Sequence, residues 1–480
     1  MKLKNPELFQ QANYWNGQWR QSSTGEVIEV DNPSTGKIIG QVPSVNRAEV
    51  ADAIDVAERA FQSWRQEPAH TRAKVLRKWG DLLLTHVDDL AEILTTEQGK
   101  PLAEAKGEVR YAASYLHWFA EEAPRNYGDT IPAPKTSQKI IVQKQPIGVC
   151  GCITPWNFPI AMLARKVAAA LAAGCTVVAK PAEATPFSAL ALAYLGECAG
   201  VPGGVFNIVT GDSAMIGDEF TENPKIRKIS FTGSTRVGRL LQEKSGRNLI
   251  KLSLELGGNA PLIVFDDADL DLAVKGTIAA KFRNAGQTCV CVNRLFVQRS
   301  IYDEFKKKLK VAVEALVVGD GHDEGVTIGP LIHQKAVEKF QKHFDDAVAQ
   351  GARVICGDGK ANGNFVKPVL MTDGKPSMMF CQEETFAPLL VAVPFDTEEE
   401  AIQLANDTPY GLASYFYSNN ISRVMRVTDA LESGMVGVNE TAISNATAPF
   451  GGVKWSGYGR EGSKYGMDEY LQVKYVLLGG

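Results

Sequence analysis

The sequence has few of the features that mark secreted, membrane or nucleic-acid-binding proteins. Its 480 residues include only eight cysteines, a density far below that of domains held together by disulfides. Acidic and basic residues nearly balance at a formal net charge of −4, so no basic excess favours nucleic acid or an anionic membrane surface. The N-terminal stretch MKLKNPELFQQ lacks the apolar core of a signal peptide. These absences predict a cytoplasmic protein with neither a nucleic-acid nor a membrane partner.

Long hydrophobic runs are missing as well. Residues 145–164 carry no charge, but Pro146, Pro155 and Pro159 interrupt them, which favours a buried core or an active-site loop over a membrane span. Cys150 and Cys152 have no second His or Cys pair at zinc spacing nearby, so we expect no metal site. With 45% apolar and 22% charged residues, the chain is expected to form two or three globular domains.

Strands and helices alternate along most of the chain. Asn16-Gly17 predicts an early hairpin, and residues 136–145 are typical of a β-hairpin arm. Apolar spacing predicts helices over 50–64, 74–94, 102–120, 188–198, from 235, and over 270–281, 301–316, 334–350 and 398–406. Strands are expected at 151–154, 176–179, 204–209, 228–231, 250–254, 295–297 and 473–478, and near 353, 388, 412 and 435. The alternation predicts βαβ units around parallel sheets, with a cofactor domain first and a nucleophile domain second.

Polar residues follow several of the predicted strands. Asn157, Lys180, Ser234 and Glu255 each stand at or just after such a strand end. Ligands of parallel sheets bind at the carboxyl ends of the strands, so the pattern predicts a binding cleft there. The segment GSTRVG at 233–238 joins a strand to a helix, where glycine lets the backbone approach a phosphate. It is not the G-x-G-x-x-G fingerprint, and an ordinary strand–helix turn is equally compatible with it.

The stretch FRNAGQTCVCVNR at 282–294 contains the strongest candidate for a reactive group. A lone cysteine such as Cys289 is usually a small buried hydrophobe. Here a polar, glycine-containing turn precedes it, which suits an exposed loop held between a helix and a strand. Arg283 is placed to lower the pKa of a nearby thiol, and the thiolate is the form that attacks carbon. The local pattern leaves a packing cysteine and a nucleophile both open.

Other single residues are equally ambiguous, but their combination is not. Glu255 is a general base or a surface glutamate, Asn157 an oxyanion donor or a turn residue, and Glu384 a ribose ligand or a charged cap. A thiol nucleophile, a carboxylate base, an amide donor and a dinucleotide cleft are together the parts needed to oxidise an aldehyde. The thiol adds to the carbonyl, the adduct loses hydride, and water hydrolyses the resulting thioester.

The chain resembles the aldehyde dehydrogenases along essentially its whole length. TPWNFP, FTGS, LELGGNAP, FRNAGQTCVC, EETFAP and PFGGVKWSGYGREG stand in the family order. The resemblance implies Cys289 as nucleophile, Glu255 as base, and Asn157 with the Cys289 N–H as oxyanion hole. It links Lys166 and Glu461 to proton relay and site order. The cofactor contacts it implies are Trp156, Lys180, Ala182, Glu183, Gly211, Phe231, Gly233, Ser234, Gly238, Leu256, Glu384 and Phe386.

The resemblance also implies a fold and an assembly. It predicts an α/β protein with a Rossmann-like cofactor domain (1–127 and 147–255) and an α/β catalytic domain (256–448). A small β oligomerisation arm (128–146 and 460–480) completes the fold. Members of the family are oligomeric, so a homodimer or homotetramer is expected. The predicted C-terminal strand fits this expectation, because its apolar run would otherwise leave an exposed edge.

Within the family, the chain is most similar to succinate-semialdehyde dehydrogenases, and nearly as similar to glutarate-semialdehyde dehydrogenases. GDTIP at 128–132, CVCVNR, ISNATAPFGG and REGSKYG carry this likeness. It implies an aldehyde with a terminal carboxylate, held by Arg165, Arg283 and Ser444. NAD is the expected cofactor, because the Glu183 carboxylate would repel the 2′-phosphate of NADP. NADP stays a second acceptor, since Lys180 can bridge to that phosphate.

Three features leave alternatives. In the family, a disulfide at the positions of Cys289 and Cys291 can switch activity off, whereas Cys291 is otherwise a small packing residue. Ala387 replaces the glycine usual after Phe386, which is expected to shift the loop under the nicotinamide ribose. Cys150 and Cys152 also depart from the family, without a functional interpretation. A broad-range or betaine-type dehydrogenase and an inactive structural relative are the competing functions.

Overall fold

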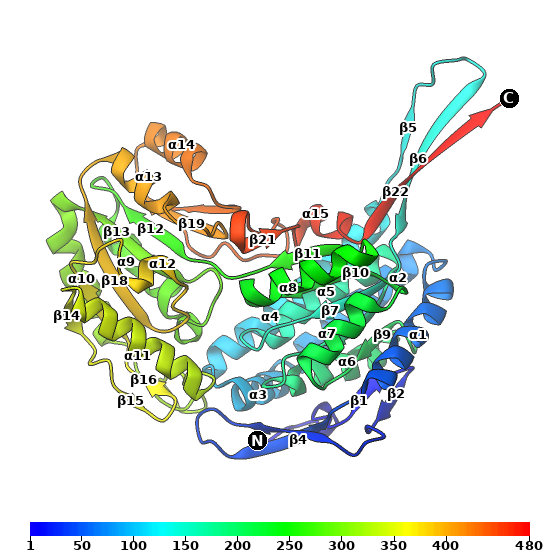
Figure 1. The fold of residues 1–480 in the computed structure, drawn as a ribbon, viewed down its shortest axis with the longest axis horizontal. Helices are drawn as coiled ribbons and strands as arrows, with labels where there is room; N and C mark the ends of the chain where they lie inside the picture. The colour runs from blue at the N-terminus through cyan, green and yellow to red at the C-terminus, as the bar shows by residue number, and fades with distance from the viewer.

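Two helix-covered sheets form the two halves of the molecule (Figure 1). The structure is a computed structural model that describes residues 1–480. In the first half the strand order is β2-β1-β9-β8-β7-β10-β11-β21. The strands are β1 (Asn13–Trp15), β2 (Gln18–Arg20), β7 (Val149–Ile153), β8 (Thr176–Lys180), β9 (Phe206–Ile208), β10 (Ile226–Thr232), β11 (Lys251–Glu255) and β21 (Gly457–Tyr458). Strands β7, β8, β10 and β11 run parallel, so their carboxyl ends share one edge.

The second half repeats this plan with the order β14-β17-β18-β13-β12-β19-β20. Its strands are β12 (Ala260–Val264), β13 (Val292–Gln298), β14 (Arg353–Cys356), β17 (Val369–Thr372), β18 (Leu389–Phe395), β19 (Ala413–Tyr417) and β20 (Met435–Val438). All neighbours are parallel except β14 and β17. Each half has its own buried hydrophobic core. The predicted α/β fold with parallel sheets is confirmed.

Helices cover both sheets. Those of the first half are α1 (Arg47–Trp64), α2 (Ala69–Thr85), α3 (Val87–Gln98), α4 (Leu102–Glu122), α5 (Pro159–Ala173), α6 (Pro186–Ala199), α7 (Ser213–Glu222) and α8 (Thr235–Ser245). Those of the second are α9 (Leu270–Phe282), α10 (Tyr302–Glu314), α11 (Gln334–Ala349), α12 (Met379–Gln382), α13 (Glu398–Asn406) and α14 (Ile421–Ala430). None of the helices has both the length and the apolar character needed to cross a bilayer.

The prediction of one helix over 74–94 is wrong. The chain breaks at His86, between α2 and α3. Both helices pack against α4, so the apolar spacing continues through the break and hides it. Asp88 and Asp89 in the first turn of α3 favour a new helix start there, because carboxylates stabilise helix N-termini.

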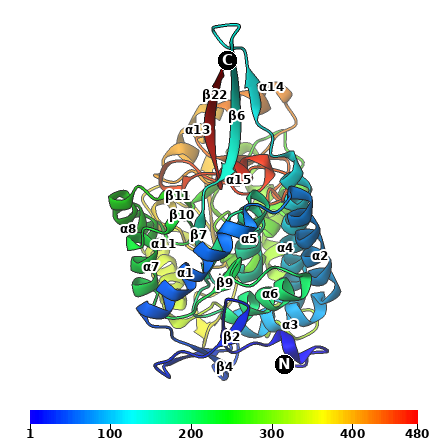
Figure 2. The same cartoon turned by 90° about the vertical axis from the view of Figure 1, so that its right-hand side faces the viewer.

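A third, three-stranded sheet projects from the first half. Its order is β22 (Leu471–Gly479), β6 (Gln138–Pro146) and β5 (Asp129–Ile131). Seen from the side, this arm stands at one end of the molecule with the C-terminus near its tip, and the N-terminus lies at the opposite end (Figure 2). A hairpin of β3 (Val27–Asp31) and β4 (Ile38–Pro43) lies near the N-terminus, and β15 (Ala361–Asn362) pairs with β16 (Phe365–Val366) in the second half. After the second half, the chain passes along the first half again and then enters the arm. On this path β21 pairs with β11, and α15 (Ser463–Asp468) packs on α4 and α5.

Two buried glutamates fix the helices that follow β7 and β8. Glu108 on α4 accepts the N–H groups of Ile160 (3.0 Å) and Ala161 (3.2 Å) at the start of α5. Glu97 on α3 accepts those of Phe187 (2.8 Å) and Ser188 (2.9 Å) at the start of α6. These carboxylates satisfy N–H groups that lack partners within the helix. They therefore hold the loops at the carboxyl ends of both strands.

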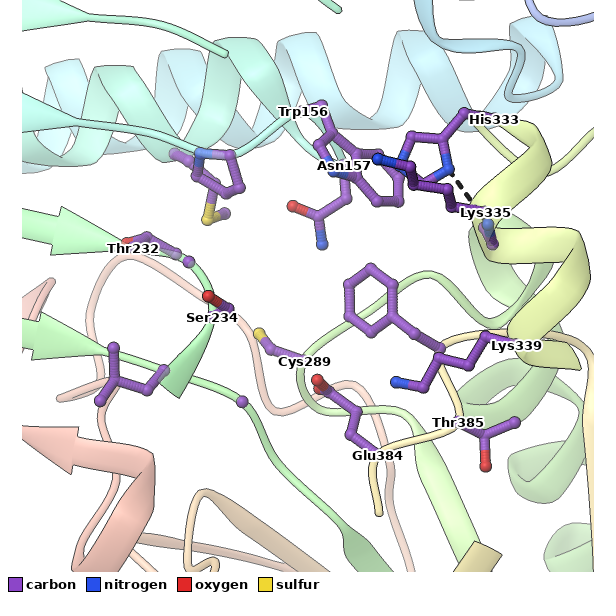
Figure 3. Close-up of a pocket in the computed structure, with 17 residues that line it drawn as sticks. Trp156, Asn157, Thr232, Ser234, Cys289, His333, Lys335, Lys339, Glu384 and Thr385 are labelled. Atoms are coloured by element: carbon purple, nitrogen blue, oxygen red, sulfur yellow. Dashed lines mark hydrogen bonds between the residues drawn. The ribbon is translucent and has the colours of Figure 1, made fainter. Parts of the chain in front are cut away.

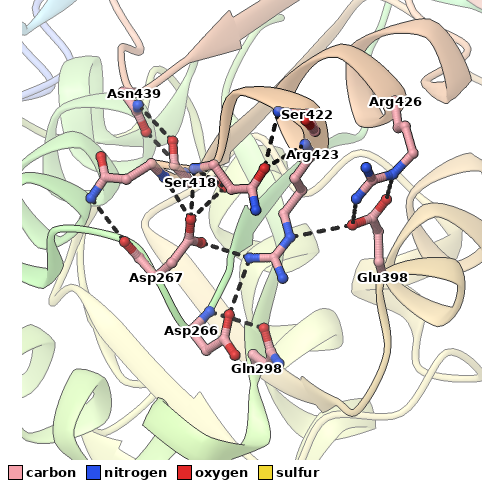
Figure 4. A network of polar contacts seen from close by, with 11 residues as sticks. Asp266, Asp267, Gln298, Glu398, Ser418, Ser422, Arg423, Arg426 and Asn439 are labelled. Carbon is pink, nitrogen blue, oxygen red and sulfur yellow. Dashed lines mark hydrogen bonds and ion pairs between the residues drawn. The ribbon is translucent and has the colours of Figure 1, made fainter.

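A polar network fastens α13 and α14 to the second sheet (Figure 4). Asp267 accepts hydrogen bonds from the Ser418 hydroxyl (2.9 Å) and from the Asn420 N–H (2.8 Å). Arg423 bridges Asp267 (2.7 Å) and Glu398 (3.3 Å). The network joins the segments after β12 and β19 to the two helices.

Candidate active site

Cys289 lies in a loop of unusual backbone shape between α9 and β13. Asn284 and Ala285 adopt left-handed conformations at φ 51° and 55°, which cost L-residues roughly 1–2 kcal/mol each. Gly286 follows at φ +76°, and a Cβ there would lie 2.5 Å from the Ala387 carbonyl oxygen. Such a shape persists only when surrounding contacts hold it.

The prediction that this loop is exposed is wrong. Asn284, Gln287 and Thr288 are at most 3% exposed. Their polarity serves internal hydrogen bonds: the Gln287 amide donates to the carbonyls of Asn284 (3.1 Å) and Pro330 (3.3 Å) and accepts the Ile332 N–H (3.0 Å). The polar side chains of this loop therefore form hydrogen bonds with other segments of the chain, and not with water as the sequence prediction assumed.

Two cavities meet at Cys289. The first, of about 280 Å³, is lined by Pro155, Trp156, Asn157, Met162, Thr232, Gly233, Ser234, Leu256, Gly257, Cys289, His333, Lys335, Ala336, Lys339, Glu384, Thr385 and Phe386 (Figure 3). The second, of about 270 Å³, is lined by Glu104, Gly107, Glu108, Tyr111, Phe158, Met162, Arg165, Arg283, Thr288, Cys289, Val290, Ser444 and Phe450. Only Cys289 and Met162 line both. The Cys289 thiol is thus placed between two binding spaces.

The first cavity has the features of a dinucleotide site. The Ser234 hydroxyl caps α8 by accepting the Val237 N–H (3.3 Å), and a helix N-terminus attracts phosphate. Gly233 packs so closely that a Cβ would lie 2.5 Å from the Phe231 ring. Glu384 accepts the Gly258 N–H (3.1 Å), and burial raises its pKa to about 7. Of the predicted cofactor residues, Trp156, Gly233, Ser234, Leu256, Glu384 and Phe386 line this cavity.

The remaining predicted cofactor residues lie outside that lining. At the end of β8, the Lys180 ammonium pairs with Glu183 (2.6 Å), and the Ser213 hydroxyl contacts both. The Glu183 side chain is 40% exposed, so it is accessible to ribose hydroxyls. Ala182 is partly exposed beside it. Phe231 packs against Gly233 and Gly238 packs against Leu256, and both of these partners line the cavity. Gly211 instead packs against Val45.

The second cavity carries two guanidinium groups. Arg165 is 1% exposed, and its Nη1 and Nη2 have no hydrogen-bond partner. Its Nε side forms an ion pair with Glu461. The Arg283 guanidinium lies 5.2 Å from the centre of the Phe158 ring. Together with Ser444, these are the three residues predicted to hold a substrate carboxylate, and the structure places all of them in one cavity with Cys289.

Burial dominates the acidity of the nucleophile. It raises the pKa of Cys289 to about 12, while Arg165 and, less strongly, Arg283 lower it. Arg283 therefore acts in the predicted direction, but desolvation outweighs it. The thiol is protonated in this state. Forming the thiolate requires a base or a change in the surroundings when ligands bind.

Two N–H groups are placed near the reacting centre. The Asn157 amide donates to the Gln287 carbonyl (3.0 Å) through Nδ2, which leaves its second hydrogen free. The N–H of Cys289 takes part in no backbone hydrogen bond. Figure 3 shows the Asn157 amide directed into the cavity, on the side that also contains Cys289. These are the two groups that the sequence resemblance predicts as oxyanion donors.

Glu255 belongs to a buried charged cluster beside the two cavities, although it lines neither. Its carboxylate oxygens have no hydrogen-bond partner. Burial, and then Glu461, raise its pKa well above the ordinary value. Glu461 pairs with both Arg165 and Lys166, and the Lys166 ammonium also donates to the Ser230 hydroxyl (3.1 Å). The predicted relay residues Lys166 and Glu461 are therefore in direct contact.

Cys291 is buried and does not line the first cavity. Its sulfur lies 3.5 Å from the Lys281 carbonyl and 3.6 Å from the Val292 carbonyl. Both cysteines are free thiols. A disulfide between Cys289 and Cys291 would require the Cys291 thiol to leave these contacts.

The sequence interpretation missed the contribution of α11 to the first cavity. His333 caps this helix by accepting the Ala336 N–H (3.1 Å), and its ring centre lies 6.2 Å from that of Trp156. Lys335 and Lys339 line the same wall. Their spacing of four residues was a visible signal of one helix face, but no pattern in the sequence indicated which face meets the cleft.

Comparison with known proteins agrees with this geometry. Residues 19–476 match the aldehyde dehydrogenase family. The chain is 56% identical to the NADP(+) succinate-semialdehyde dehydrogenase of Escherichia coli (strain K12) and 54% identical to the glutarate-semialdehyde dehydrogenase of Pseudomonas putida, with all chains fully covered. A crystal structure of succinate-semialdehyde dehydrogenase from Burkholderia pseudomallei matches with a TM-score of 0.99 at 55% identity, covering 100% of both chains. The family match and the full-length identities show that this chain belongs to the aldehyde dehydrogenase family.

Proposed function

We propose that this aldehyde dehydrogenase oxidises succinate semialdehyde to succinate. The observation that carries the proposal is the unpartnered Nη1 and Nη2 of the buried Arg165 in a cavity that ends at Cys289. A guanidinium offers a planar, bidentate site for a carboxylate. Two of the relatives are named for semialdehydes whose far end is a carboxylate. Glutarate semialdehyde, longer by one methylene, is the second candidate substrate.

In the proposed reaction the Cys289 thiol first gives its proton to the ionised Glu255 carboxylate, which passes it to water, and the thiolate then adds to the aldehyde carbon. The carbonyl oxygen becomes an oxyanion, which accepts hydrogen bonds from Asn157 Nδ2 and from the Cys289 N–H. When bound in the first cavity, a nicotinamide dinucleotide supplies the acceptor for the hydride that leaves this adduct. The substrate is then held on Cys289 as a thioester.

Water must next hydrolyse that thioester. Glu255 takes a proton from the water, the hydroxide adds to the thioester carbon, and the carbon–sulfur bond breaks to release the acid. Glu255 then releases this proton toward bulk water, and the paired Glu461 and Lys166 beside it order that path. Burial and Glu461 raise the pKa of Glu255, and Arg165 and Lys166 oppose only part of that rise, so the ionised carboxylate is a stronger base than an exposed glutamate.

The cofactor would lie across the carboxyl ends of β7, β8, β10 and β11. Its phosphates would lie at Gly233 and Ser234, one ribose at Glu384, and the other ribose at Lys180 and Glu183. We propose NAD as the preferred acceptor, because the Glu183 carboxylate accepts hydrogen bonds from ribose hydroxyls and repels a 2′-phosphate. NADP is the second acceptor, since Lys180 offers a cation at the same place, and the E. coli relative is named for NADP(+).

The remaining assignments are part of the same proposal. The first half (1–127 and 147–255) serves as the cofactor domain, 256–448 as the catalytic domain, and 128–146 with 460–480 as an arm that joins a cytoplasmic homodimer or homotetramer. Cys291 would form an inhibitory disulfide with Cys289. Peroxide inactivation that dithiothreitol reverses in the wild type, but that is irreversible in Cys291→Ala, would support this switch.

Steady-state kinetics with a panel of aldehydes tests the proposed function. Succinic, glutaric, short neutral and betaine aldehydes are each assayed with NAD and with NADP, using wild type, Cys289→Ala and Glu183→Ser. The expected result is the highest kcat/KM with succinic semialdehyde and NAD, no turnover by Cys289→Ala, and a shift toward NADP in Glu183→Ser. Turnover by Cys289→Ala would refute the covalent route, and a preference for betaine aldehyde would refute the anion pocket.

A further inference from the structure

Lys100 is a fully buried cation in the turn between α3 and α4. Its side chain is 0% exposed. Gly99 ends α3 at φ +92°, and Pro101 precedes α4. A buried ammonium is costly unless all of its N–H groups have partners. The identity of those partners therefore indicates what the lysine does.

The ammonium has three partners, one for each N–H. It donates to the Glu108 carboxylate (2.6 Å) and to the backbone carbonyl of Asn157 (2.7 Å). It also lies 3.8 Å from the centre of the Phe158 ring, on the face that attracts cations. Two of the three contacts fall on the segment that carries the proposed oxyanion donor.

Asn157 is held from both halves of the molecule. Its carbonyl accepts a second hydrogen bond from Asn284 Nδ2 (3.0 Å), and its own Nδ2 donates to the Gln287 carbonyl (3.0 Å). Both Asn284 and Gln287 belong to the loop of Cys289. Lys100 supplies the contact from the opposite side, and its removal would leave the Asn157 carbonyl with one hydrogen bond.

The second half also fixes the position of Lys100 itself. The Leu102 N–H donates to the Gly321 carbonyl (3.0 Å). A Cβ on Gly321 would lie 2.5 Å from the Lys100 carbonyl oxygen, and one on Gly329 would meet the Gly99 carbonyl. Backbone packs directly on backbone here, so the turn has no room to shift.

We propose that Lys100 is a positioning residue that sets the place of the Asn157 amide in the oxyanion hole. This role rests on the proposed function, in which Asn157 stabilises the oxyanion on the aldehyde carbon. A buried ion pair adds little net stability compared with apolar side chains of similar volume. Three fixed donors can orient three groups at once, which an apolar side chain cannot do.

The test uses Lys100→Met combined with Glu108→Gln in the full-length protein. The single Lys100 variant would leave an unpaired buried carboxylate, whereas glutamine keeps an acceptor for the Ile160 and Ala161 N–H groups. Acylation of Cys289 by p-nitrophenyl acetate passes through an oxyanion, but alkylation by iodoacetamide does not. We expect acylation to slow by about 10- to 100-fold, less than the loss of a whole oxyanion donor, and alkylation to change less than twofold.

A double-mutant cycle with Asn157→Ala separates positioning from general damage. In that background the Lys100→Met/Glu108→Gln pair is expected to slow acylation by less than twofold. Arg72→Met is the matched control, because Arg72 is a buried cation that donates to the Ala172 carbonyl (3.1 Å) at the other end of α5. It should leave acylation unchanged.

Three outcomes would overturn the proposal: wild-type acylation by the Lys100/Glu108 pair, an equal loss with iodoacetamide, or an undiminished loss in the Asn157→Ala background. If Asn157→Ala itself acylates normally, the oxyanion assignment fails, and the proposed function must be revised together with the role of Lys100.

Discussion

The Arg165 side chain pairs with a buried carboxylate through Nε and keeps its two Nη groups free of hydrogen bonds to the protein. Its Nε side neutralises Glu461, which also holds Lys166. Its Nη1 and Nη2 donate no hydrogen bond to the protein. An arginine can divide its donors in this way because the guanidinium is planar and always charged. Under the proposed function, the residue would link the charge of the buried Glu461–Lys166 cluster to the binding of a substrate anion.

Arg165→Ala is expected to lower kcat/KM for succinic semialdehyde far more than for a neutral aldehyde of similar length. Loss of the charge-assisted hydrogen bonds should cost about 10- to 100-fold beyond any shared effect of freeing Glu461. The ratio of kcat/KM for the two aldehydes is the measurement. Ser444→Ala, which removes a neutral partner, should give a smaller change in the ratio, and an unchanged ratio for Arg165→Ala would contradict the assignment.

Glu255 should make thioester hydrolysis depend on pH. Because burial and Glu461 raise its pKa, the carboxyl keeps its proton to a higher pH than an exposed glutamate does and becomes a base as the pH rises. Hydrolysis should therefore speed up toward alkaline pH. In Glu255→Gln, intact-protein mass spectrometry should detect accumulated acyl-enzyme. The rate of thioester hydrolysis in this variant should not increase with pH. Hydrolysis that is equally fast in the variant would exclude Glu255 as the base.

The residues of the site were predictable to different degrees. The family motifs placed Cys289, Asn157, Arg165, Arg283 and Ser444, and the structure brings them together around two cavities. Local patterns missed the burial of the Cys289 loop and the role of Lys100. Their partners lie far away in the chain: Asn157 and Gln287 are 130 positions apart. Such contacts exist only once the two halves have packed.

At the scale of elements, the two helices after β7 and β8 depend on carboxylates from another part of the chain. Glu108 and Glu97 each accept two N–H groups of a helix start. Apolar periodicity predicted most helices, but α5 was not among them, because its run of small apolar residues is buried on all sides and shows no polar face. The break between α2 and α3 was hidden for the related reason that both pack on α4.

The contact of α11 with the loop of Glu384 should weaken in acid. His343 on α11 lies beside the Thr385 hydroxyl, 3.3 Å from Nδ1. Burial lowers its pKa from 6.5 to about 4. As the pH falls below 6.5, the unfolded chain binds a proton that the native protein excludes until about pH 4, so stability is lost across that window.

The free energy of unfolding that His343 contributes, and that is lost between pH 6.5 and pH 4, amounts to at most about 3 kcal/mol. His343→Gln should have a shallower decline of melting temperature between pH 7 and pH 4.5 than the wild type. Thermal unfolding followed by fluorescence at several pH values measures it. Parallel curves for the two proteins would show that His343 does not contribute.

At the scale of the whole molecule, the arm carries an uncovered apolar face. Val473, Tyr475 and Leu477 alternate along β22 and are 70%, 60% and 46% exposed. Tyr475 stands opposite Val142, and Leu477 opposite Ile140, so the same face continues onto β6. A contiguous apolar face of this kind is typical of interaction surfaces.

Tyr475→Glu is expected to reduce the size of the assembly, because it places a charge in that face. Sedimentation velocity of the wild type should give a dimer or tetramer, and the variant should sediment as a smaller species. Lys474→Glu is the matched control, since Lys474 lies on the opposite face of the same strand and should not change the assembly. A monomeric wild type would rule out the arm as an oligomer contact.

Because the two cavities meet at Cys289, their arrangement determines how inhibitors compete with each ligand and in which order the two products can leave. Apart from Cys289 and Met162 the cavities share no lining residue, so under the proposed function the aldehyde would reach the sulfur without passing through the cofactor cleft. Either product, the reduced cofactor or the acid, should then be able to dissociate first, because neither blocks the exit of the other. A compound that fills one cavity should compete with one ligand and leave the other free to bind. Only a compound that reaches the thiol should block both.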